Sequence, residues 1–175
     1  IVTGASSFMG LTVVRELGML GIQTEAVIRP SSPARGALEE MEHVRVRPCL
    51  LEEIRFLAEK TGLKEADAWL HLGWEGAGSA NRQNPEPQRK NIGYAMESLR
   101  TAAALGCGRF LFTGSQAEYG ICREPMREDG ECHPVSEYGK DKLEVCRRAS
   151  AAAGALGLTY LHARVFSVYG PGDHP

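Results

Sequence analysis

The segment that most constrains the fold is the first one, where an apolar strand, a glycine turn and an amphipathic helix follow one another. Ile1-Val2 leads into the turn Thr3-Gly4-Ala5-Ser6-Ser7-Phe8-Met9-Gly10, and leucine and valine then recur at helical spacing as far as Leu20. Such a turn aims the free N–H groups and the positive dipole end of a helix at an anion, and glycine lets the backbone approach that anion closely. The layout predicts a site for the pyrophosphate of a dinucleotide.

Strand patterns and helix patterns alternate along the rest of the chain. After the first strand, five more are predicted at residues 24–28, 44–46, 67–73, 109–113 and 158–166, with helices around 51–60, 87–105 and 136–154. Residues 74–88 are rich in Gly, Asn, Pro and Gln, which predicts a long surface loop, either a lid on the substrate side or a plain connection. The alternation predicts an α/β fold with a Rossmann-type, doubly wound parallel sheet in the order 3-2-1-4-5-6.

The end of the second strand bears on the choice of cofactor. This strand ends at Ile28-Arg29, with no acidic residue to hold a free ribose 2′-hydroxyl. A cation accommodates a 2′-phosphate, so we expect NADP in preference to NAD, with Ser31 or Ser32 assisting Arg29. The alternative is an arginine that merely solvates the end of the strand. His71, in the apolar fourth strand, is interpreted as a buried, hydrogen-bonded core residue.

A phenol and an ammonium stand four residues apart in the sequence Ser136-Glu137-Tyr138-Gly139-Lys140-Asp141-Lys142, at the start of a predicted helix. Residues at i and i+4 share a helix face, so the head groups of Tyr138 and Lys142 can reach one point. A fixed cation favours the phenolate, which makes Tyr138 a candidate proton shuttle near neutral pH. The alternative is a surface helix with an exposed Tyr and Lys.

Two further polar residues are candidates by position. Ser115 follows the fifth strand, at the edge of the sheet where α/β sites collect their chemistry. Asn91 lies inside a predicted helix, where asparagine is locally unfavourable, so it is expected to hold a helix bend or a water in a proton relay. An Asn91 that faces solvent is the alternative.

Composition excludes several classes of protein. The chain is 175 residues long, 43% hydrophobic and 24% charged, which suits a single domain with a sizeable core. Its 20 Lys and Arg are dispersed among 22 Asp and Glu, and the net charge of −2 indicates no nucleic-acid partner and no membrane-surface partner. Five cysteines without CxxC or Cys/His spacing indicate no disulfide framework and no metal site, and favour reduced thiols in the cytoplasm.

Six motifs follow one another in a recognisable order: TGASSFMG, DAWLHLGW, KNIGYAMESL, FLFTGSQAEYG, PVSEYGKDK and ARVFSVYGPGD. In these the chain resembles the extended short-chain dehydrogenases/reductases of the NAD-dependent epimerase/dehydratase group, most of which act on nucleotide sugars. Gly4, Ser7 and Gly10 match the GxxGxxG fingerprint of the group, with serine in place of the middle glycine. Relatives carry Asp where Cys49 stands, so only the backbone of Leu50 is expected to replace its contact with adenine.

The resemblance assigns roles to individual residues. Ser115 matches the catalytic Ser/Thr, Tyr138 the catalytic Tyr, Lys142 its partner, which also bridges the nicotinamide ribose, and Asn91 the relay Asn. The predicted cofactor contacts are Gly4, Ser6, Ser7, Phe8, Met9, Gly10, Arg29, Leu50, Leu72, Gly73, Thr113, Tyr138, Lys142 and Val165. The implied activity is that of an NAD(P)-dependent epimerase or ketoreductase of a nucleotide-activated sugar.

Departures from the group's pattern narrow the reaction. Sugar 4,6-dehydratases carry Asp-Glu directly after the catalytic Ser/Thr, and Gln116-Ala117 stands there instead, so dehydration is disfavoured. The fucose-synthase branch has a Cys where Ala117 stands. Glu118 replaces a usually apolar residue and is expected to bind substrate hydroxyls or Arg164, or to remain a solvated carboxylate. Ser167 replaces an Asn that contacts substrate in many relatives.

Two other functions and two features of organisation complete the expectations. The chain is alternatively a binding module or sensor that holds NADP without turnover, or a Rossmann-like methyltransferase, although the latter explains neither Ser115 nor the Tyr138/Lys142 pair. A homodimer through the Asn91 and Tyr138 helices is expected from the resemblance, with alanines at 102–104 and 149–153 leaving room for close packing. Residues 1–175 are expected to form one NAD(P)-binding Rossmann domain truncated at both ends, with the C-terminal substrate subdomain largely absent.

Overall fold

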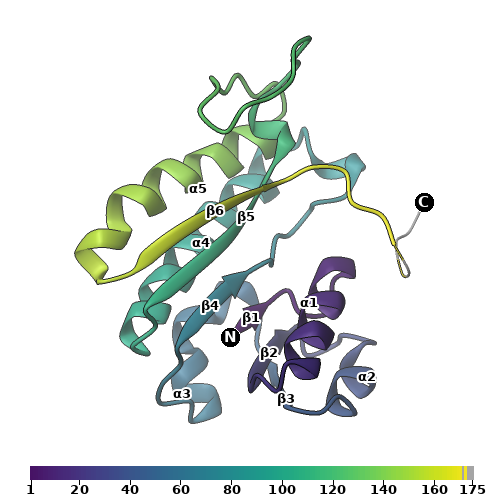
Figure 1. Ribbon diagram of the computed structural model, residues 1–175, viewed down its shortest axis with the longest axis vertical. Coiled ribbons are helices and arrows are strands. Elements are labelled where there is room, and N and C mark those ends of the chain that lie inside the picture. The colour runs from purple at the N-terminus through teal and green to yellow at the C-terminus, as the bar shows by residue number, and fades with distance from the viewer. Residues whose placement is uncertain (171, 173–175) are drawn as a thin grey trace.

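The computed structural model describes residues 1–170 and 172, and in it a six-stranded sheet lies between two layers of helices (Figure 1). The strands are β1 Val2–Thr3, β2 Thr24–Ile28, β3 Val44–Pro48, β4 Ala68–His71, β5 Arg109–Ser115 and β6 Thr159–Val165. The α-helices are α1 Phe8–Met19, α2 Arg35–Glu39, α3 Leu57–Thr61, α4 Pro85–Ala104 and α5 Glu137–Ala153. Short 3₁₀ helices are η1 Leu51–Phe56, η2 Ser79–Asn81, η3 Gln116–Glu118 and η4 Gly154–Leu156.

The strand order confirms the predicted topology. The order is β3-β2-β1-β4-β5-β6, and every neighbouring pair is parallel. Strands β1 and β4, which are neighbours in the sheet but not in the sequence, flank the point at which the chain reverses its direction of travel across the sheet. In this doubly wound arrangement, ligands bind beyond the carboxyl ends of the strands near that switch point.

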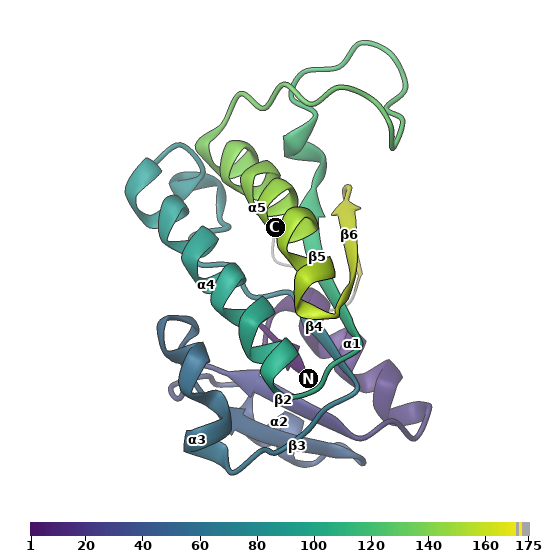
Figure 2. The same ribbon diagram turned by 90° about the vertical axis from the view of Figure 1, so that its left-hand side faces the viewer.

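The apolar faces of the helices cover the two faces of the sheet. One core cluster joins Val14 of α1 and Leu38 of α2 to Val2, Ala26 and Ile28 of the strands. The other, larger cluster packs η1, α4 and α5 against the opposite face, where α4 and α5 lie side by side (Figure 2). Its members include Ile54, Leu99, Phe110, Phe112 and Val145. Burial on both faces accounts for the apolar residues of the inner strands β1 and β5, whereas β3 at the edge alternates valine with arginine.

Two predicted boundaries differ from the structure. The single helix expected at 51–60 is the 3₁₀ helix η1 followed by the short helix α3. The helix expected from about 87 begins earlier, at Pro85, because the side chain of Asn84 accepts a hydrogen bond from Glu86 N (3.3 Å) and proline suits the first helical position. Helix α5 begins as predicted, with the side chain of Ser136 accepting a bond from Gly139 N (3.0 Å).

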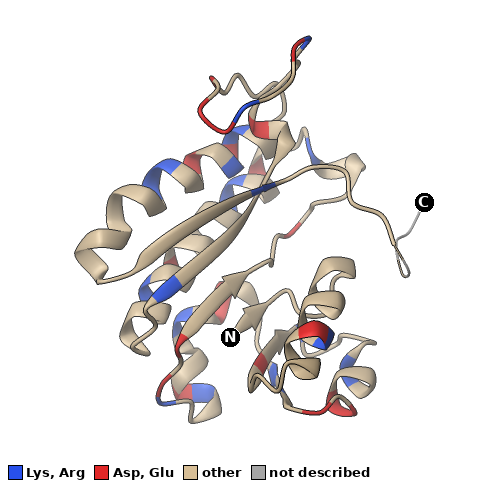
Figure 3. Ribbon diagram, viewed as in Figure 1, with Lys and Arg blue, Asp and Glu red and all other residues tan. Residues whose placement is uncertain are grey.

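Charges are mixed rather than segregated. Acidic and basic residues alternate along α5 and over the loops (Figure 3). Among the residues described, no helix combines the length and apolar character needed to cross a bilayer, and no group of three or more His, Cys, Asp and Glu side chains is placed to hold a metal ion. All five cysteines are free.

Candidate active site

A cavity of about 1100 Å³ lies at the carboxyl edge of the sheet, where the strand ends of the two halves meet. Most of the residues predicted for the site line it: Gly4, Ser6, Ser7, Phe8, Met9, Arg29, Leu72, Gly73, Thr113, Ser115, Tyr138, Lys142 and Val165. Three predicted site residues, Gly10, Leu50 and Asn91, are not part of its lining. Residues as far apart as Gly4 and Val165 therefore share one cavity only because the strands are parallel and in register.

The glycine turn has the geometry of an anion cradle. Ser7 caps helix α1, and its Oγ accepts a hydrogen bond from Gly10 N (3.0 Å), which leaves the hydroxyl proton free to donate. Gly4 has a φ of 70°, and a Cβ there would lie 2.6 Å from Gly73 N. A Cβ on Gly10 would overlap the carbonyl oxygen of Gly4. Gly10 thus serves close packing of helix on turn, and the cradle fits a dinucleotide pyrophosphate.

Arg29 is the one residue of the predicted 2′-phosphate site that lines the cavity. Ser32 is buried, with its N–H donating to the carbonyl of Arg29 (3.0 Å), and neither it nor Ser31 lines the cavity. At the adenine position the cavity is lined by Cys49 and Leu51 rather than by Leu50. The Leu50 carbonyl accepts the N–H of Glu53 (3.1 Å), so it is already engaged at the start of η1.

Ser115 and Tyr138 reach the cavity from different elements. Ser115 is the last residue of β5 and caps η3, where its Oγ accepts a hydrogen bond from Ala117 N (3.2 Å). Tyr138 lies in the first turn of α5, and Gly139 beside it lets that helix approach the carbonyl of Ala117, which a Cβ would overlap. The predicted convergence of a strand-end hydroxyl and a helix phenol is therefore present.

The environment of Tyr138 corrects one expectation. Burial raises the pKa of the phenol above its ordinary value, although the Ser115 hydroxyl and, more weakly, the Arg82 guanidinium act to lower it. The sequence argument expected Lys142 to hold Tyr138 towards phenolate. That expectation was wrong for this structure because both groups are buried, with exposed fractions of 8% and 3%, and burial disfavours each charge.

Lys142 sits in a closed, largely aromatic environment. Its Nζ donates to the carbonyl of Thr113 (2.7 Å) and lies 4.1 Å from the centre of the Trp74 ring and 4.6 Å from that of Phe112. The Tyr138 ring is farther, at 5.6 Å. Burial lowers the pKa of Lys142 to about 7, with Glu118 opposing the shift. The amine thus changes its charge near neutral pH, in the range where proton transfer is useful.

Asn91 is buried, so the solvent-facing alternative was wrong. Its exposed fraction is 1%. Its side chain accepts a hydrogen bond from Glu75 N (2.8 Å) and donates to Glu75 O (3.0 Å), as well as to the carbonyls of Pro87 (3.1 Å) and Gln88 (3.2 Å). The amide clamps both backbone groups of Glu75 and so fixes the start of the loop that follows β4. A relay role for Asn91 stays a prediction.

Comparisons with known proteins identify the group. A sequence model described as the NAD dependent epimerase/dehydratase family matches residues 1–175. The chain belongs to this family. The family predicted from the motifs is therefore confirmed.

Solved structures share the fold. MoeE5 in complex with UDP-glucose and NAD is 30% identical, with a TM-score of 0.82 over 99% of this chain and 56% of that chain. The UDP-glucose 4-epimerase of Thermotoga maritima with UDP-glucose is 24% identical, with a TM-score of 0.83 over 97% of this chain and 56% of that chain. That of Thermus thermophilus with NAD is 20% identical, with a TM-score of 0.85 over 99% and 57%. The chain spans little more than half of each.

In this family member the loop after β4 contributes residues that the sequence argument passed over. Trp74 packs edge-on against the Tyr138 ring, with centroids 5.8 Å apart, and its Nε1 donates to Gln88 Oε1 (2.7 Å). Gln88 is fully buried and donates in turn to the carbonyls of Gly76 (2.7 Å) and Asn81 (3.1 Å). The feature of the sequence that could have indicated this role is a tryptophan directly after Gly73, the glycine at the end of the strand. The loop therefore packs against Tyr138 and Lys142 through Trp74.

The same loop places two charged groups in the cavity. The Arg82 guanidinium carbon lies 5.0 Å from the centre of the Tyr138 ring, and the carbonyl of Arg82 accepts the N–H of Tyr138 (3.0 Å). Glu75 is exposed and is the one carboxylate that lines the cavity among the residues described. Neither residue is detectable from a polar loop sequence, because only the fold brings this loop against α5.

The remaining expectations concern two buried polar groups. His71 is a core residue, as predicted: its Nδ1 is 2.9 Å from Thr3 Oγ1, and burial, with Lys142 nearby, lowers its pKa to about 3. Glu118 is fully buried and bound to Arg164, so the alternative of a solvated carboxylate was wrong. Its side chain does not line the cavity, which also removes it as a ligand of substrate hydroxyls in this structure.

Proposed function

We propose that this chain forms the cofactor-binding and catalytic part of an NAD(P)-dependent enzyme that epimerises or reduces a nucleotide-activated sugar. The observation that carries the proposal is the cavity in which Ser115, Tyr138 and Lys142 converge beyond the anion cradle of α1. Family membership and the nucleotide-sugar complexes of MoeE5 and the Thermotoga maritima enzyme supply the substrate class.

The residues have separable roles in this chemistry. When bound, the nicotinamide dinucleotide supplies a hydride acceptor and donor. Tyr138 takes the proton from a sugar hydroxyl, and the Ser115 hydroxyl hydrogen-bonds the same oxygen. Lys142, whose pKa of about 7 allows it to be charged or neutral at physiological pH, would hold the cofactor ribose. Trp74 excludes water from the Lys142 side of the pair.

The cavity lining supports epimerisation or ketoreduction over dehydration. Gln116 and Ala117, which line the cavity beside Ser115, lack a titratable side chain, and the Glu118 carboxylate lies outside it. Elimination of water needs an acid and a base at neighbouring carbons. Hydride transfer with one proton shuttle needs only the groups described above.

We further propose that the cofactor is NADP, held at its 2′-phosphate by Arg29. Arg29 lines the cavity after β2, while the one carboxylate of the described lining, Glu75, lies beside Trp74 at the catalytic end. This choice differs from MoeE5 and the Thermus thermophilus enzyme, which were solved with NAD. Calorimetric titration of the chain with each dinucleotide tests it. Tighter NADP⁺ binding that weakens in Arg29→Asp, but not in the exposed control Arg15→Asp, supports the proposal; tighter NAD⁺ binding overturns the role of Arg29.

The catalytic proposal is tested by Tyr138→Phe in the full-length protein. The substitution removes the proton shuttle and is expected to abolish turnover of UDP-glucose or UDP-glucuronic acid. Cofactor affinity is expected to stay within about twofold, because the phenol hydroxyl acts in proton transfer rather than in holding the cofactor. Undiminished turnover overturns the mechanism. Cofactor binding without any turnover by the unsubstituted protein favours the alternative of a non-catalytic NADP-binding sensor. Preferential binding of S-adenosylmethionine favours the methyltransferase alternative.

We also propose a homodimer through α4 and α5, on the family resemblance. Three of the alanines do not support it, since Ala102, Ala149 and Ala153 are buried within the chain's own core, whereas Ala151 and Ala152 line the groove described next. What supports it is a groove of about 500 Å³ between the two helices, lined by Met96, Arg148 and their neighbours. Light scattering on the full-length protein tests the mass, and a monomer overturns this part of the proposal.

A further inference from the structure

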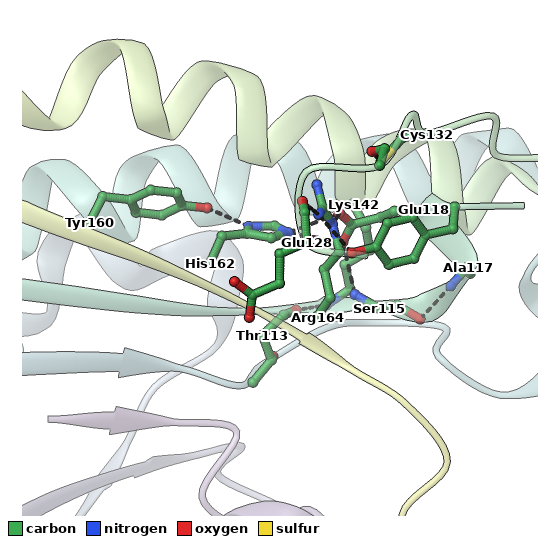
Figure 4. Close-up of polar contacts among 12 residues, drawn as sticks. Thr113, Ser115, Ala117, Glu118, Glu128, Cys132, Lys142, Tyr160, His162 and Arg164 are labelled. Carbon is green, nitrogen blue, oxygen red and sulfur yellow. Dashed lines mark hydrogen bonds and ion pairs between the residues drawn. The ribbon is translucent and has the colours of Figure 1, made fainter. Parts of the chain in front are cut away.

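The most unusual buried group outside the cavity is the carboxylate of Glu118, at the end of η3. Its exposed fraction is 0%, and it contacts residues of both β5 and β6 (Figure 4). An unpaired carboxylate in such a place is strongly disfavoured, so its partners define what it does.

Both oxygens of Glu118 are engaged, by groups of β5 and β6. Oε1 accepts the backbone N–H of Ser115 (2.8 Å), while Oε2 accepts Arg164 Nε (2.9 Å) from β6. His162 Nε2 lies 3.0 Å from Oε1 and 2.9 Å from Oε2. Figure 4 shows these contacts meeting at the carboxylate. The backbone of Ser115 is thus bound, through a single side chain, to two residues of the neighbouring strand.

The space for this carboxylate is created by a glycine. A Cβ on Gly114 would overlap His162 Nε2, and it would come 2.5 Å from Glu118 Oε1. Gly114 directly precedes Ser115, so the same short stretch supplies the space, the anchored N–H and the anchoring carboxylate. Burial acts to raise the pKa of Glu118, but hydrogen bonds from His162 and Arg164 outweigh it, and the group stays ionised at neutral pH.

The network extends to the loop that follows η3. Arg164 Nη1 donates to Tyr119 Oη (3.0 Å) and to the carbonyl of Glu128 (3.1 Å). This loop includes Gly120 and Met126, which line the cavity. Arg164 therefore holds the loop and, through Glu118, the strand end that carries Ser115.

We propose that Glu118 is a positioning residue for Ser115, holding its backbone so that the hydroxyl faces Tyr138 across the cavity. This inference rests on the proposed function, in which Ser115 hydrogen-bonds the reacting oxygen. Glu118 does not touch substrate or cofactor. It restricts the backbone of Ser115 at the end of β5 to one position. This constraint matters because small misplacements of reacting groups lower rates steeply.

The decisive variant is Glu118→Gln, because an amide has one acceptor oxygen where the carboxylate has two. That oxygen can serve the Ser115 N–H or Arg164 Nε, but not both in the present geometry. Adding Arg164→Met removes one competing donor, which leaves the amide oxygen to Ser115 and His162. Glu124→Gln, an exposed carboxylate in the next loop, is the matched control.

Two readouts separate positioning from catalysis. In Glu118→Gln we expect the Ser115 amide, followed by hydrogen exchange in NMR spectra, to exchange roughly tenfold faster or more, in keeping with the loss of a charge-assisted bond. In the full-length protein we expect kcat for UDP-glucose or UDP-glucuronic acid to fall roughly 10- to 100-fold, with KM and the cofactor dissociation constant within about twofold. The double variant is expected to recover much of the exchange protection of the Ser115 amide but not kcat, because Arg164 also holds the loop that lines the cavity. Glu124→Gln is expected to change neither readout.

Contrary results are equally clear. Unchanged Ser115 exchange and unchanged kcat in Glu118→Gln overturn the proposal. So does a double variant in which the Ser115 amide exchanges faster still, since removing the Arg164 donor must then have freed no oxygen for that amide. If the unsubstituted protein turns over neither sugar nucleotide, the proposed function fails, while exchange at the Ser115 amide still decides whether Glu118 positions it.

Discussion

The clamp that Asn91 places on Glu75 allows a quantitative prediction. Asn91→Ala removes two hydrogen bonds to the Glu75 backbone, at 2.8 and 3.0 Å, from a site where the side chain is 1% exposed. Each bond contributes about 1 kcal/mol, and each partner left unpaired adds about 1–3 kcal/mol if it stays buried. Alanine returns about 0.6 kcal/mol through its better helix propensity.

The sum predicts that Asn91→Ala lowers the free energy of unfolding by about 1.5 kcal/mol where water reaches the freed Glu75 groups and by more than about 3 kcal/mol where they stay buried, or the melting temperature by on the order of 5–10 °C for a domain of this size. Urea unfolding followed by tryptophan fluorescence measures it. Trp74 lies in the clamped loop and Trp69 in the core, so loosening of the loop alone would appear as a separate early change. Because the loop covers Lys142, we expect exposure of Trp74 to precede global unfolding in the variant.

The matched control is Ser98→Ala on the same helix. Ser98 Oγ is fully buried and has no hydrogen-bond partner among the described residues, so removing it is expected to be neutral or stabilising by up to about 1 kcal/mol. The reasoning is refuted if Asn91→Ala lowers the free energy of unfolding by less than about 1 kcal/mol, or if Ser98→Ala lowers it equally. Either result would mean that the hydrogen-bonded Asn91 amide stabilises the fold no more than an unpaired hydroxyl does.

Three further predictions follow from the same structure. Burial lowers the pKa of His71 to about 3, so the unfolded chain binds this proton at a higher pH than the folded chain does. The free energy of unfolding should therefore fall by about 1.4 kcal/mol per pH unit as the pH drops from 6.5 towards 3. Unfolding measured between pH 7 and 5 should lack this His71 contribution in His71→Asn. Gly10→Ala should weaken dinucleotide binding in calorimetry and destabilise the fold by about 1–3 kcal/mol, whereas Gly36→Ala, where a Cβ meets open space, should not. Arg82→Gln should raise the pKa of Tyr138, and Arg82→Lys should raise it less because the positive charge is kept. An ultraviolet difference titration against Tyr138→Phe measures this pKa, and an unchanged value in Arg82→Gln contradicts the electrostatic role of the guanidinium.

Local pattern was sufficient for the architecture. The alternation of apolar runs and helical periodicity, with a glycine turn after the first strand, determined the sheet order, because parallel strands joined by helices have few arrangements. The spacing of Tyr138 and Lys142, and the position of Ser115 at a strand end, were enough to place all three at one cavity. These properties depend on periods of two and 3.6 residues, which a sequence displays directly.

Charge state and polar pairing were decided only by the tertiary structure. Lys142 was expected to act as a fixed cation, yet burial in the folded chain lowers its pKa to about 7. Glu118 finds its partner His162 at a separation of 44 residues, across two strands whose register no local pattern specifies. Burial and long-range partners set the free energy of a charge, and both exist only once the chain has folded.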